Sequence, residues 1–400
     1  MSQMPAIMRH VLWPLAVMAT IQLLATMTFL TVPVLAPALA QDIGVAASRI
    51  GIYSALVFAG ATLISLVSGP LIGRYGAVRM CQVGLSLAAV SLAATTLGSL
   101  PLILVSAVLL GIGYGPATPA GSHVLARVTP AEIRGIVFSI KQSGVPLGGA
   151  VVGLAAPLIS VWAGWQAAVL VIASLALFAA VALQSARARL DDDRQPGLPI
   201  ASDAIWSSVA LVARQTALRR IAFACFAFAG AQLCLFAVLV AYLVTEVGLD
   251  HVAAGAAYAT MQIAGVVARV IWGWLVDRLM AARVALGLIG FGSTVFVLAT
   301  SAMTPEWPYG GVLLVAVLLG VTVSGWNGIA LAEVARVAPD HVGMATAGTV
   351  VFTYFGIVVA PSTFSAVVAA TDGYDAAYWA LALLTALAGL ILLRRAPAAS

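Results

Sequence analysis

Two positively charged residues stand inside long apolar stretches of this sequence, where an ionisable side chain is costly unless it is paired or faces water. Lys141 follows Arg134 by seven residues and Arg269 precedes Asp277 by eight, so both lie on the order of 10–12 Å from the polar ends of their stretches. Our assigned apolar stretches contain no Asp or Glu, which leaves a bound anion as one way to neutralise the two cations. The pattern predicts a site for an anion such as a carboxylate, which arginine holds through two parallel hydrogen bonds and lysine as a movable point charge.

Polar side chains accompany both cations at helical spacing. Tyr258, Gln262, Gly265 and Arg269 follow spacings of 4, 3 and 4 residues and share one face of a helix. For each amide, a hydrogen bond between helices is an equally good interpretation, and both cations could instead extend to the membrane surface. The candidate substrate-binding residues are Arg269, Lys141, Gln262, Gln22, Gln142, Tyr258, Asn327 and Tyr354, with Gln232 and Thr26 as further polar positions.

His123 is the one histidine well inside an apolar stretch, and proton coupling usually requires a titratable group. It precedes Arg127 by four residues, which favours a position at the inner membrane surface. A proton could also travel with a weakly acidic substrate, or the protein could exchange anions, and these alternatives stay open.

The elements that position these residues follow from the composition. The chain of 400 residues is 62% apolar and only 8% charged, against about 25% charged residues in soluble domains. Its mean hydropathy of +1.09 indicates that most of the chain lies in a bilayer. The net charge of +5 is scattered between apolar stretches, so we expect no nucleic-acid partner.

A helix that crosses roughly 30 Å of hydrocarbon needs about 20 apolar residues. We therefore expect an all-α membrane protein with twelve transmembrane helices in two six-helix, pseudo-symmetric bundles. The bundles would comprise residues 1–184 and 220–400, joined by a cytoplasmic linker over residues 185–219. The twelve predicted spans are 11–35, 50–72, 80–98, 102–125, 135–159, 163–184, 220–244, 252–276, 284–302, 309–332, 343–368 and 376–394.

Most of the basic residues fall between these spans on one side, which predicts that both termini are cytoplasmic in a multi-pass protein of the inner membrane. The start of the chain imitates a secretory signal, but its apolar stretch exceeds the usual 7–15 residues, so we expect it to be retained as a helix. The linker carries Asp191, Asp192 and Asp193, which we interpret as a solvated, charge-balancing loop in preference to a cation site.

An internal repeat supports the two bundles. The segment that begins at Gly69 returns at Gly273, and Leu109-Leu110-Gly111 returns as Leu318-Leu319-Gly320. The first copy of the loop contains Gly69, Leu71, Arg74, Gly76 and Arg79, and the second contains Gly273, Leu275, Asp277, Arg278 and Arg283.

These loops resemble the signature of the major facilitator superfamily, Gly-x-Leu-x-Asp-Arg-x-Gly-x-x-Arg, and the resemblance extends over essentially the whole chain. It implies a transporter with two six-helix halves and a site near the membrane midplane. Gly73 replaces the acid of the first copy, and Met280 replaces a glycine of the second. Simple topological anchoring is the alternative to the gating role that the resemblance implies for Gly69, Arg74, Arg79, Gly273, Asp277, Arg278 and Arg283.

The fifth predicted span also resembles a family motif. Gly144, Pro146 and Gly148 match the Gly-x-Pro-x-Gly of monocarboxylate transporters and form a degenerate version of the antiporter motif of drug exporters. Arg269 resembles the arginine of the eighth helix that meets the substrate carboxylate in monocarboxylate and oxalate transporters. The resemblance therefore implies a monocarboxylate-like substrate.

The preferred function is a secondary transporter of small organic anions, functional as a monomer in the bilayer and possibly proton-coupled. The alternative is a proton-coupled exporter of multiple drugs or amphipathic compounds. A membrane enzyme would need His, Cys, Asp or Glu at ligand spacing, and we see none, so we expect no metal, cofactor or catalytic residue. No ATP-binding Gly-x-x-x-x-Gly-Lys-Ser/Thr segment is present either.

Overall fold

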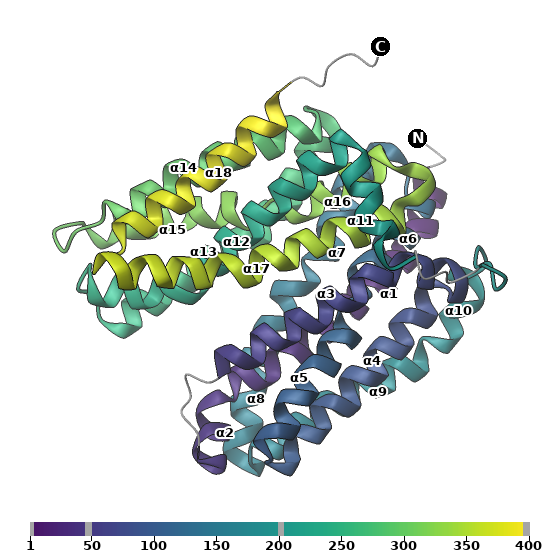
Figure 1. Cartoon of the computed structure of the whole chain (residues 1–400), viewed down its shortest axis with the longest axis horizontal. Helices are drawn as coiled ribbons and strands as arrows, with labels where there is room; N and C mark the ends of the chain where they lie inside the picture. Colours follow the sequence, from purple (N-terminus) through teal and green to yellow (C-terminus); the bar gives the residue numbers. More distant parts are fainter. Residues whose placement is uncertain (1–3, 45–49, 199–203, 395–400) are drawn as a thin grey trace. The chain divides into compact units, whose positions relative to one another are not determined.

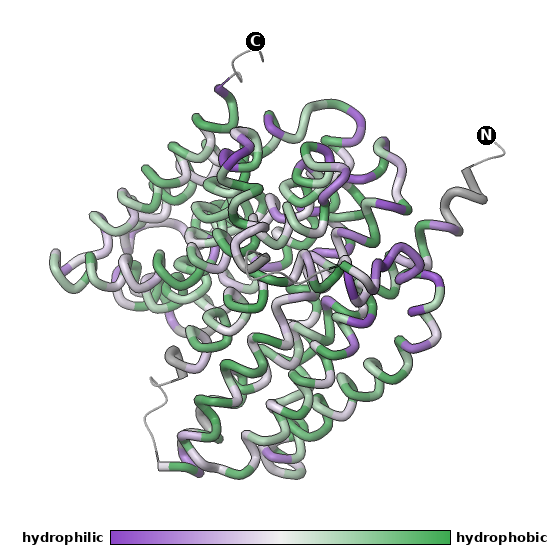
Figure 2. Tube along the Cα trace, turned by 45° about the vertical axis from the view of Figure 1, so that its right-hand side comes forward, coloured by the Kyte–Doolittle hydropathy of each residue, from purple (hydrophilic) through white to green (hydrophobic). Residues whose placement is uncertain are grey.

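The computed structural model describes residues 4–44, 50–198 and 204–394, and all regular elements within these ranges are helices. Apolar residues run along most of their length, and hydrophilic residues gather mainly at helix ends and connections (Figure 2). Backbone groups in hydrocarbon must be satisfied within their own segment, which a helix achieves. The predicted all-α membrane fold is confirmed.

Eleven stretches of the described residues are long and apolar enough to cross a membrane. One of them, Ala131–Ala182, is 52 residues long and contains a break at Gly164, whose φ of +86° suits glycine. Dividing this stretch at Gly164 accounts for the fifth and sixth of the twelve predicted spans.

The described helices form two compact units. The first comprises residues up to Thr129, then Lys141–Leu211 and Ala338–Val351, and the second comprises Pro130–Ile140, Val212–Val337 and the residues from Phe352 onward. The predicted bundle boundaries at residues 184 and 220 stay a prediction.

In unit 1, α3 and α4 pack on α5, α4 packs on α9, and α1 packs on α8 (Figure 1). The helices of this unit are α1 (Met4–Val34), α2 (Ala36–Ile43), α3 (Ile50–Tyr75), α4 (Ala77–Ala94), η2 (Thr95–Leu97), α5 (Leu100–Tyr114), α6 (Ala117–Val128), α8 (Gly144–Ala163), α9 (Trp165–Ala182), α10 (Gln184–Leu190), most of α11 (Ala204–Arg214), η4 (Pro339–His341) and the start of α17 (Val342–Thr371).

In unit 2, α14 packs on α18 and α13 packs on α15 (Figure 1). Tyr242, Phe364 and Tyr378 are buried in its core with their rings in edge-on contact. The helices are η3 (Ala131–Ile133), most of α7 (Arg134–Gln142), α12 (Thr216–Thr245), α13 (His251–Arg278), α14 (Ala282–Ser301), α15 (Tyr309–Val323), α16 (Asn327–Val337), the rest of α17 and α18 (Asp375–Leu393).

The repeated glycines allow close helix packing in both units. A Cβ at Gly111 of α5 would overlap the carbonyl oxygen of Val57 in α3, and a Cβ at Gly320 of α15 would overlap that of Met261 in α13. Small residues allow membrane helices to approach at the backbone. The repeat in the sequence is therefore a repeat of one helix-packing contact.

Three predicted spans are interrupted helices. The span 102–125 divides at Gly115-Pro116 between α5 and α6, and 309–332 divides at Ser324–Trp326 between α15 and α16. The span 135–159 divides at Ser143 between α7 and α8. Interrupted helices leave carbonyl groups without partners in the next turn, and side chains can use them.

Candidate functional site

Arg269 is fixed by one of these interruptions. Its side chain lies in α13, is 3% exposed, and donates through Nε to the carbonyl oxygen of Ser324 at 2.9 Å. One turn further along α13, Trp272 donates its indole N–H to the carbonyl oxygen of Val321 at 2.9 Å. Both acceptors lie at the end of α15, where regular helix hydrogen bonding stops. The break between α15 and α16 therefore orients the guanidinium group.

A short chain of polar contacts continues from Ser324. Gln232 of α12 donates to the Ser324 hydroxyl at 3.4 Å, and its amide oxygen accepts from the indole N–H of Trp326 at 3.3 Å. The Trp326 ring lies 6.0 Å from the ring of Phe228. Unit 2 thus places a cation, an amide and two aromatic rings around one interrupted helix. Trp326 was not among the predicted site residues; its signal was an indole in a polar break of an apolar span.

The other predicted residues of unit 2 are placed differently. Gln262 donates to the hydroxyl of Tyr258 at 3.3 Å within α13, and the Tyr258 ring packs edge-on against Phe236. Asn327 begins α16 directly after Trp326, and Tyr354 is buried in α17. Gln262 and Tyr258 form the intrahelical pair that their spacing favours, while Asn327 adjoins the Arg269 cluster along the chain.

Lys141 is the centre of a second polar cluster, in unit 1. It is 1% exposed and donates from Nζ to the amide oxygens of Gln22 at 2.7 Å and Gln142 at 2.8 Å. Thr118 donates to the same Gln22 oxygen at 3.3 Å, and a Cβ at Gly121 would lie 2.6 Å from Cε of the lysine. These three predicted residues, Lys141, Gln22 and Gln142, are therefore brought together by hydrogen bonds to neutral amides, and Lys141 forms no ion pair among the described residues.

A buried acid lies inside an apolar span, contrary to the expectation from the sequence. Glu333 of α16 is 6% exposed, and the span Tyr309–Val337 that contains it extends beyond the predicted end at residue 332. It binds Arg336 through two hydrogen bonds of 2.6 and 2.7 Å. Its partner is an arginine one turn away and neither of the two predicted cations.

The second loop copy contacts a helix start within unit 2. Asp277, at the end of α13, accepts hydrogen bonds from the backbone N–H groups of Gly135 at 2.7 Å and Ile136 at 2.8 Å. These groups belong to the first turn of α7, where a carboxylate replaces missing helix acceptors and meets the positive end of the dipole. A Cβ at Gly273 would lie 2.8 Å from the carbonyl oxygen of Gly135, so this glycine permits the close approach.

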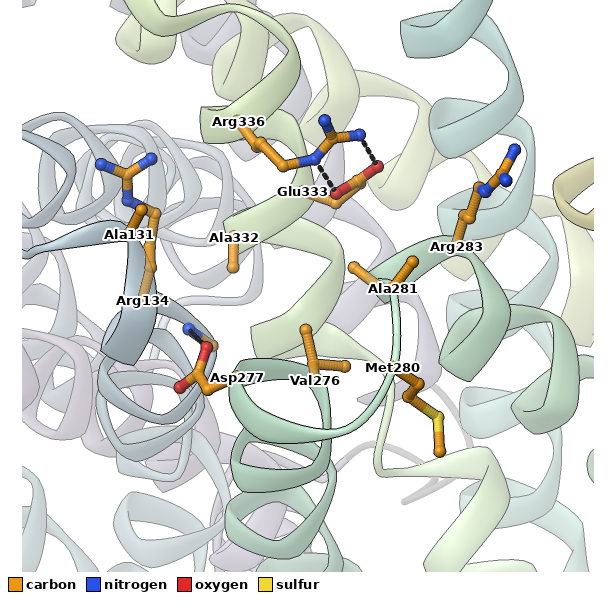
Figure 3. Close-up of a pocket in the computed structure, with 12 residues that line it drawn as sticks. Ala131, Arg134, Val276, Asp277, Met280, Ala281, Arg283, Ala332, Glu333 and Arg336 are labelled. Atoms are coloured by element: carbon orange, nitrogen blue, oxygen red, sulfur yellow. Dashed lines mark hydrogen bonds and ion pairs between the residues drawn. The ribbon is translucent and has the colours of Figure 1, made fainter.

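A pocket of about 540 Å³ opens beside this contact (Figure 3). Figure 3 shows Asp277 next to α7, and Glu333 facing Arg336 in the same pocket. Arg283 lines it as well, while Arg278 ends α13. The charged lining residues are Arg134, Asp277, Arg283, Glu333 and Arg336.

The first loop copy, in unit 1, is bound by the chain that follows α10. Gln195 donates its backbone N–H to the carbonyl oxygen of Gly73 at 2.8 Å, and Arg74 donates to the carbonyl oxygen of Leu198 at 3.0 Å. A Cβ added at Gly69 would lie 2.8 Å from Cα of Met344. The position that lacks the family acid is therefore packed against the linker.

The acidic run of the linker is solvated at Asp192 and Asp193, as expected from the sequence, whereas the burial of Asp191 corrects that expectation. Asp191 is 3% exposed and accepts from the backbone N–H groups of Val78 at 2.7 Å and Arg79 at 3.0 Å, at the start of α4. Burial raises the pKa of Asp191, although these two hydrogen bonds and Arg187 act in the opposite direction. The carboxylate of Asp191, from the linker, therefore caps the N-terminus of α4.

The next two acids bind side chains of α6. Asp192 and Asp193 both pair with Arg127, and Asp193 also lies 2.6 Å from Nε2 of His123. Burial raises the pKa of Asp193. The hydrogen bond from His123 and the charges of His123 and Arg127 lower this pKa by more, so the net shift is downward. His123 therefore belongs to the linker contacts.

Apolar helices of spanning length, a repeated architecture and interrupted helices are features of multi-pass membrane transporters. A family model described as Major Facilitator Superfamily matches residues 17–361. The chain belongs to this superfamily, whose members are secondary transporters.

Several known proteins are similar to it. The 4-hydroxybenzoate transporter PcaK of Acinetobacter baylyi is 31% identical over 133 residues, 33% of this chain and 29% of the relative. The probable sulfoacetate transporter SauU of Cupriavidus necator is 27% identical over 171 residues, 42% of this chain and 39% of the relative. These alignments thus span only about a third of the relatives' length.

Among solved structures, the fucose:proton symporter FucP of E. coli superimposes with a TM-score of 0.73 at 16% identity. The match covers 95% of this chain and 97% of FucP. At this identity the likeness shows the fold alone, and that fold is the predicted one.

Proposed function

We propose that the protein transports a small organic anion with a carboxylate group and that Arg269 binds this group. The main observation behind this proposal is that the guanidinium group of Arg269 is buried. Its Nε donates a hydrogen bond to a carbonyl oxygen at a helix break. Arginine is suited to this role because its planar guanidinium group can bind a carboxylate in two parallel hydrogen bonds. The printed names of two relatives, a 4-hydroxybenzoate and a sulfoacetate transporter, support an anionic substrate of this kind.

The surroundings of Arg269 favour a substrate with an apolar body. Trp326 and Phe228 are buried aromatic residues beside the break at Ser324, and Gln232 joins Trp326 to Ser324 through hydrogen bonds. Ligand sites combine such apolar walls with a few placed polar groups. The proposed substrate is therefore a carboxylate on a small ring or chain, with Gln262, Tyr258, Asn327 and Tyr354 as further proposed contacts.

We propose Lys141 as a second positive charge that serves the transported anion, together with Gln22 and Gln142. Two of the three donors of its ammonium group bind these amides. A buried charge held by neutral groups is expensive, and membrane proteins retain such charges where they function. Lys141 belongs to unit 1 and Arg269 to unit 2, so each is tested by its own variant.

The remaining parts of the mechanism are proposed as follows. The protein lies in the cytoplasmic membrane with both termini inside and works as a monomer. Alternating access makes and breaks the contact between Asp277 and the first turn of α7. The loop residues Gly69, Arg74, Arg79, Gly273, Arg278 and Arg283 support this gating. Protons are transported together with the anion, or the substrate carries its proton as a weak acid.

Counterflow in proteoliposomes tests the substrate class. Vesicles loaded with 4-hydroxybenzoate should exchange it for labelled 4-hydroxybenzoate, and they should not exchange tetraphenylphosphonium. Arg269→Ala should reduce exchange roughly 10- to 100-fold, since a hydrogen bond to a charged group is worth about 1.5–3 kcal/mol. Arg269→Lys should recover only part of it, because lysine lacks the planar fork.

Arg219→Gln is the matched control, since Arg219 is an exposed arginine of α12 that bonds Thr216. It should exchange like the wild type, and the amount of folded protein should be similar in all variants. Normal exchange by Arg269→Ala would remove Arg269 from the site. Exchange of cations or neutral compounds alone, across a panel of small carboxylates, would reject the anion and favour a drug exporter.

A further inference from the structure

A second pocket lies in unit 1, and neither Arg269 nor Lys141 lines it. It measures about 340 Å³ and is formed by α10 and the turn after it. The apolar span that contains α9 ends at Ala182, so the pocket begins within one helical turn of the end of a span. Its lining residues are Gln184, Arg187, Ala188, Asp191, Asp192 and Arg194.

Two arginines line this pocket, and the charge of a third acts on one of them. Arg187 and Arg194 line it, and the charges of Arg79 and Arg194 both act on Arg187. Burial and these two like charges lower the pKa of Arg187, while Asp191 acts in the opposite direction. Like charges held close together are unfavourable unless an anion offsets them.

The nearby acids are all engaged in other contacts as well. Asp191 lies 3.7 Å from Nε of Arg187, but both of its oxygens already accept backbone N–H groups at the start of α4. Asp192 and Asp193 are bound to Arg127 and His123. In the described part of the chain, neither Arg79 nor Arg194 forms an ion pair.

We propose that this pocket binds a phosphate group through Arg187 and Arg194. Guanidinium groups match phosphate oxygens in paired hydrogen bonds. A water occupies about 30 Å³ of liquid, so the pocket has room for a phosphate group with several waters. Basic pockets at the cytoplasmic ends of membrane helices bind lipid headgroups. The same chemistry suits inorganic phosphate, so the source is decided by experiment.

Two measurements on the full-length protein separate these sources. Native mass spectrometry counts bound phosphatidylglycerol against phosphatidylcholine, and a thermal-shift titration with sodium phosphate detects the soluble ion. The variants are Arg187→Gln and Arg194→Gln, which should each weaken binding about tenfold or more through loss of a charged hydrogen bond. Arg194 is exposed, so its variant tests the site without disturbing the core.

Arg189→Gln is the matched control, because it removes the same charge from the same helix, where Arg189 lies over the ring of Trp13 at 5.9 Å. Loss of phosphatidylglycerol from both test variants but not from the control would identify a lipid headgroup. Loss of the phosphate-induced shift in the same pattern would identify the soluble ion. If neither probe distinguishes the test variants from the wild type and the control, the site does not exist.

Discussion

The carboxylate of Asp277 lies 2.7 Å from the backbone nitrogen of Gly135 and holds the start of α7 at the end of α13. Asp191 performs the same kind of capping at α4, although it comes from the linker and not from a loop signature. Each unit therefore has a helix N-terminus capped by a carboxylate from far along the chain. The two caps have separate origins, since Gly73 stands where the first signature usually has its acid.

Asp277→Asn tests whether the cap on α7 controls access. The amide can accept with only one oxygen and carries no charge, so the contact should weaken by about 1–2 kcal/mol. We expect a changed rate of interconversion and a shifted population of access states. Labelling of cysteines engineered at both ends of the transport pathway measures this. Asp375→Asn, in the exposed first turn of α18, is the control. Unchanged labelling in Asp277→Asn would show that the cap is only structural.

Lys141→Met tests whether the buried ammonium serves transport or folding. Methionine fills a similar volume without a charge, and replacing a buried charge with an apolar side chain is often neutral or stabilising. Gln22 and Gln142 each lose a donor in this variant, which offsets part of that gain. We expect a melting temperature within a few degrees of the wild type and anion exchange reduced about tenfold or more. Full exchange activity would limit Lys141 to a structural role.

Gly111→Ala and Gly320→Ala test the repeated packing contact. At both positions the new Cβ would overlap a backbone carbonyl oxygen of the facing helix, so the helices must move apart. Overpacking of this kind costs about 1–3 kcal/mol. We expect lower melting temperatures in detergent for both variants. Gly153→Ala of α8 is the control, because nothing lies within 4 Å of its added Cβ. Equal stability of all three variants would contradict the close-packing interpretation.

Acid should loosen the contacts of the linker with α6. The lowered pKa of Asp193 means that its contribution to stability is present above its unfolded pKa of about 3.9 and is lost as the pH falls through the lower folded value. The raised pKa of Asp191 has the opposite sign, since protonation relieves the burial of its charge. Thermal unfolding between about pH 3 and 6 checks the balance. Asp193→Asn should be less stable than the wild type at pH 6, and this difference should shrink toward pH 3. A constant difference would contradict the role of the Asp193 charge.

The sequence singled out residues that the structure places in polar clusters, and their role in binding a substrate stays a prediction. Lys141 contacts Gln22 and Gln142, and Arg269 is buried in α13. The Ser324 carbonyl that orients Arg269 could not be foreseen, because a backbone group becomes available only where a helix is interrupted. Glu333 was missed by one residue at the end of a predicted span, a typical error for a boundary drawn from hydropathy.

The amino-acid sequence alone determined the membrane setting, the helical spans and the repeat, because hydropathy, span length and repeated glycines are local properties of the chain. Tertiary structure alone decided that Asp191 is buried on α4, that Asp277 caps α7 and that Arg269 binds a helix break. Each of these contacts joins groups between about 50 and 140 residues apart in the chain. Such partners depend on how the helices pack against one another. Residue types and spacing along the chain do not predict contacts between segments that are far apart in the sequence.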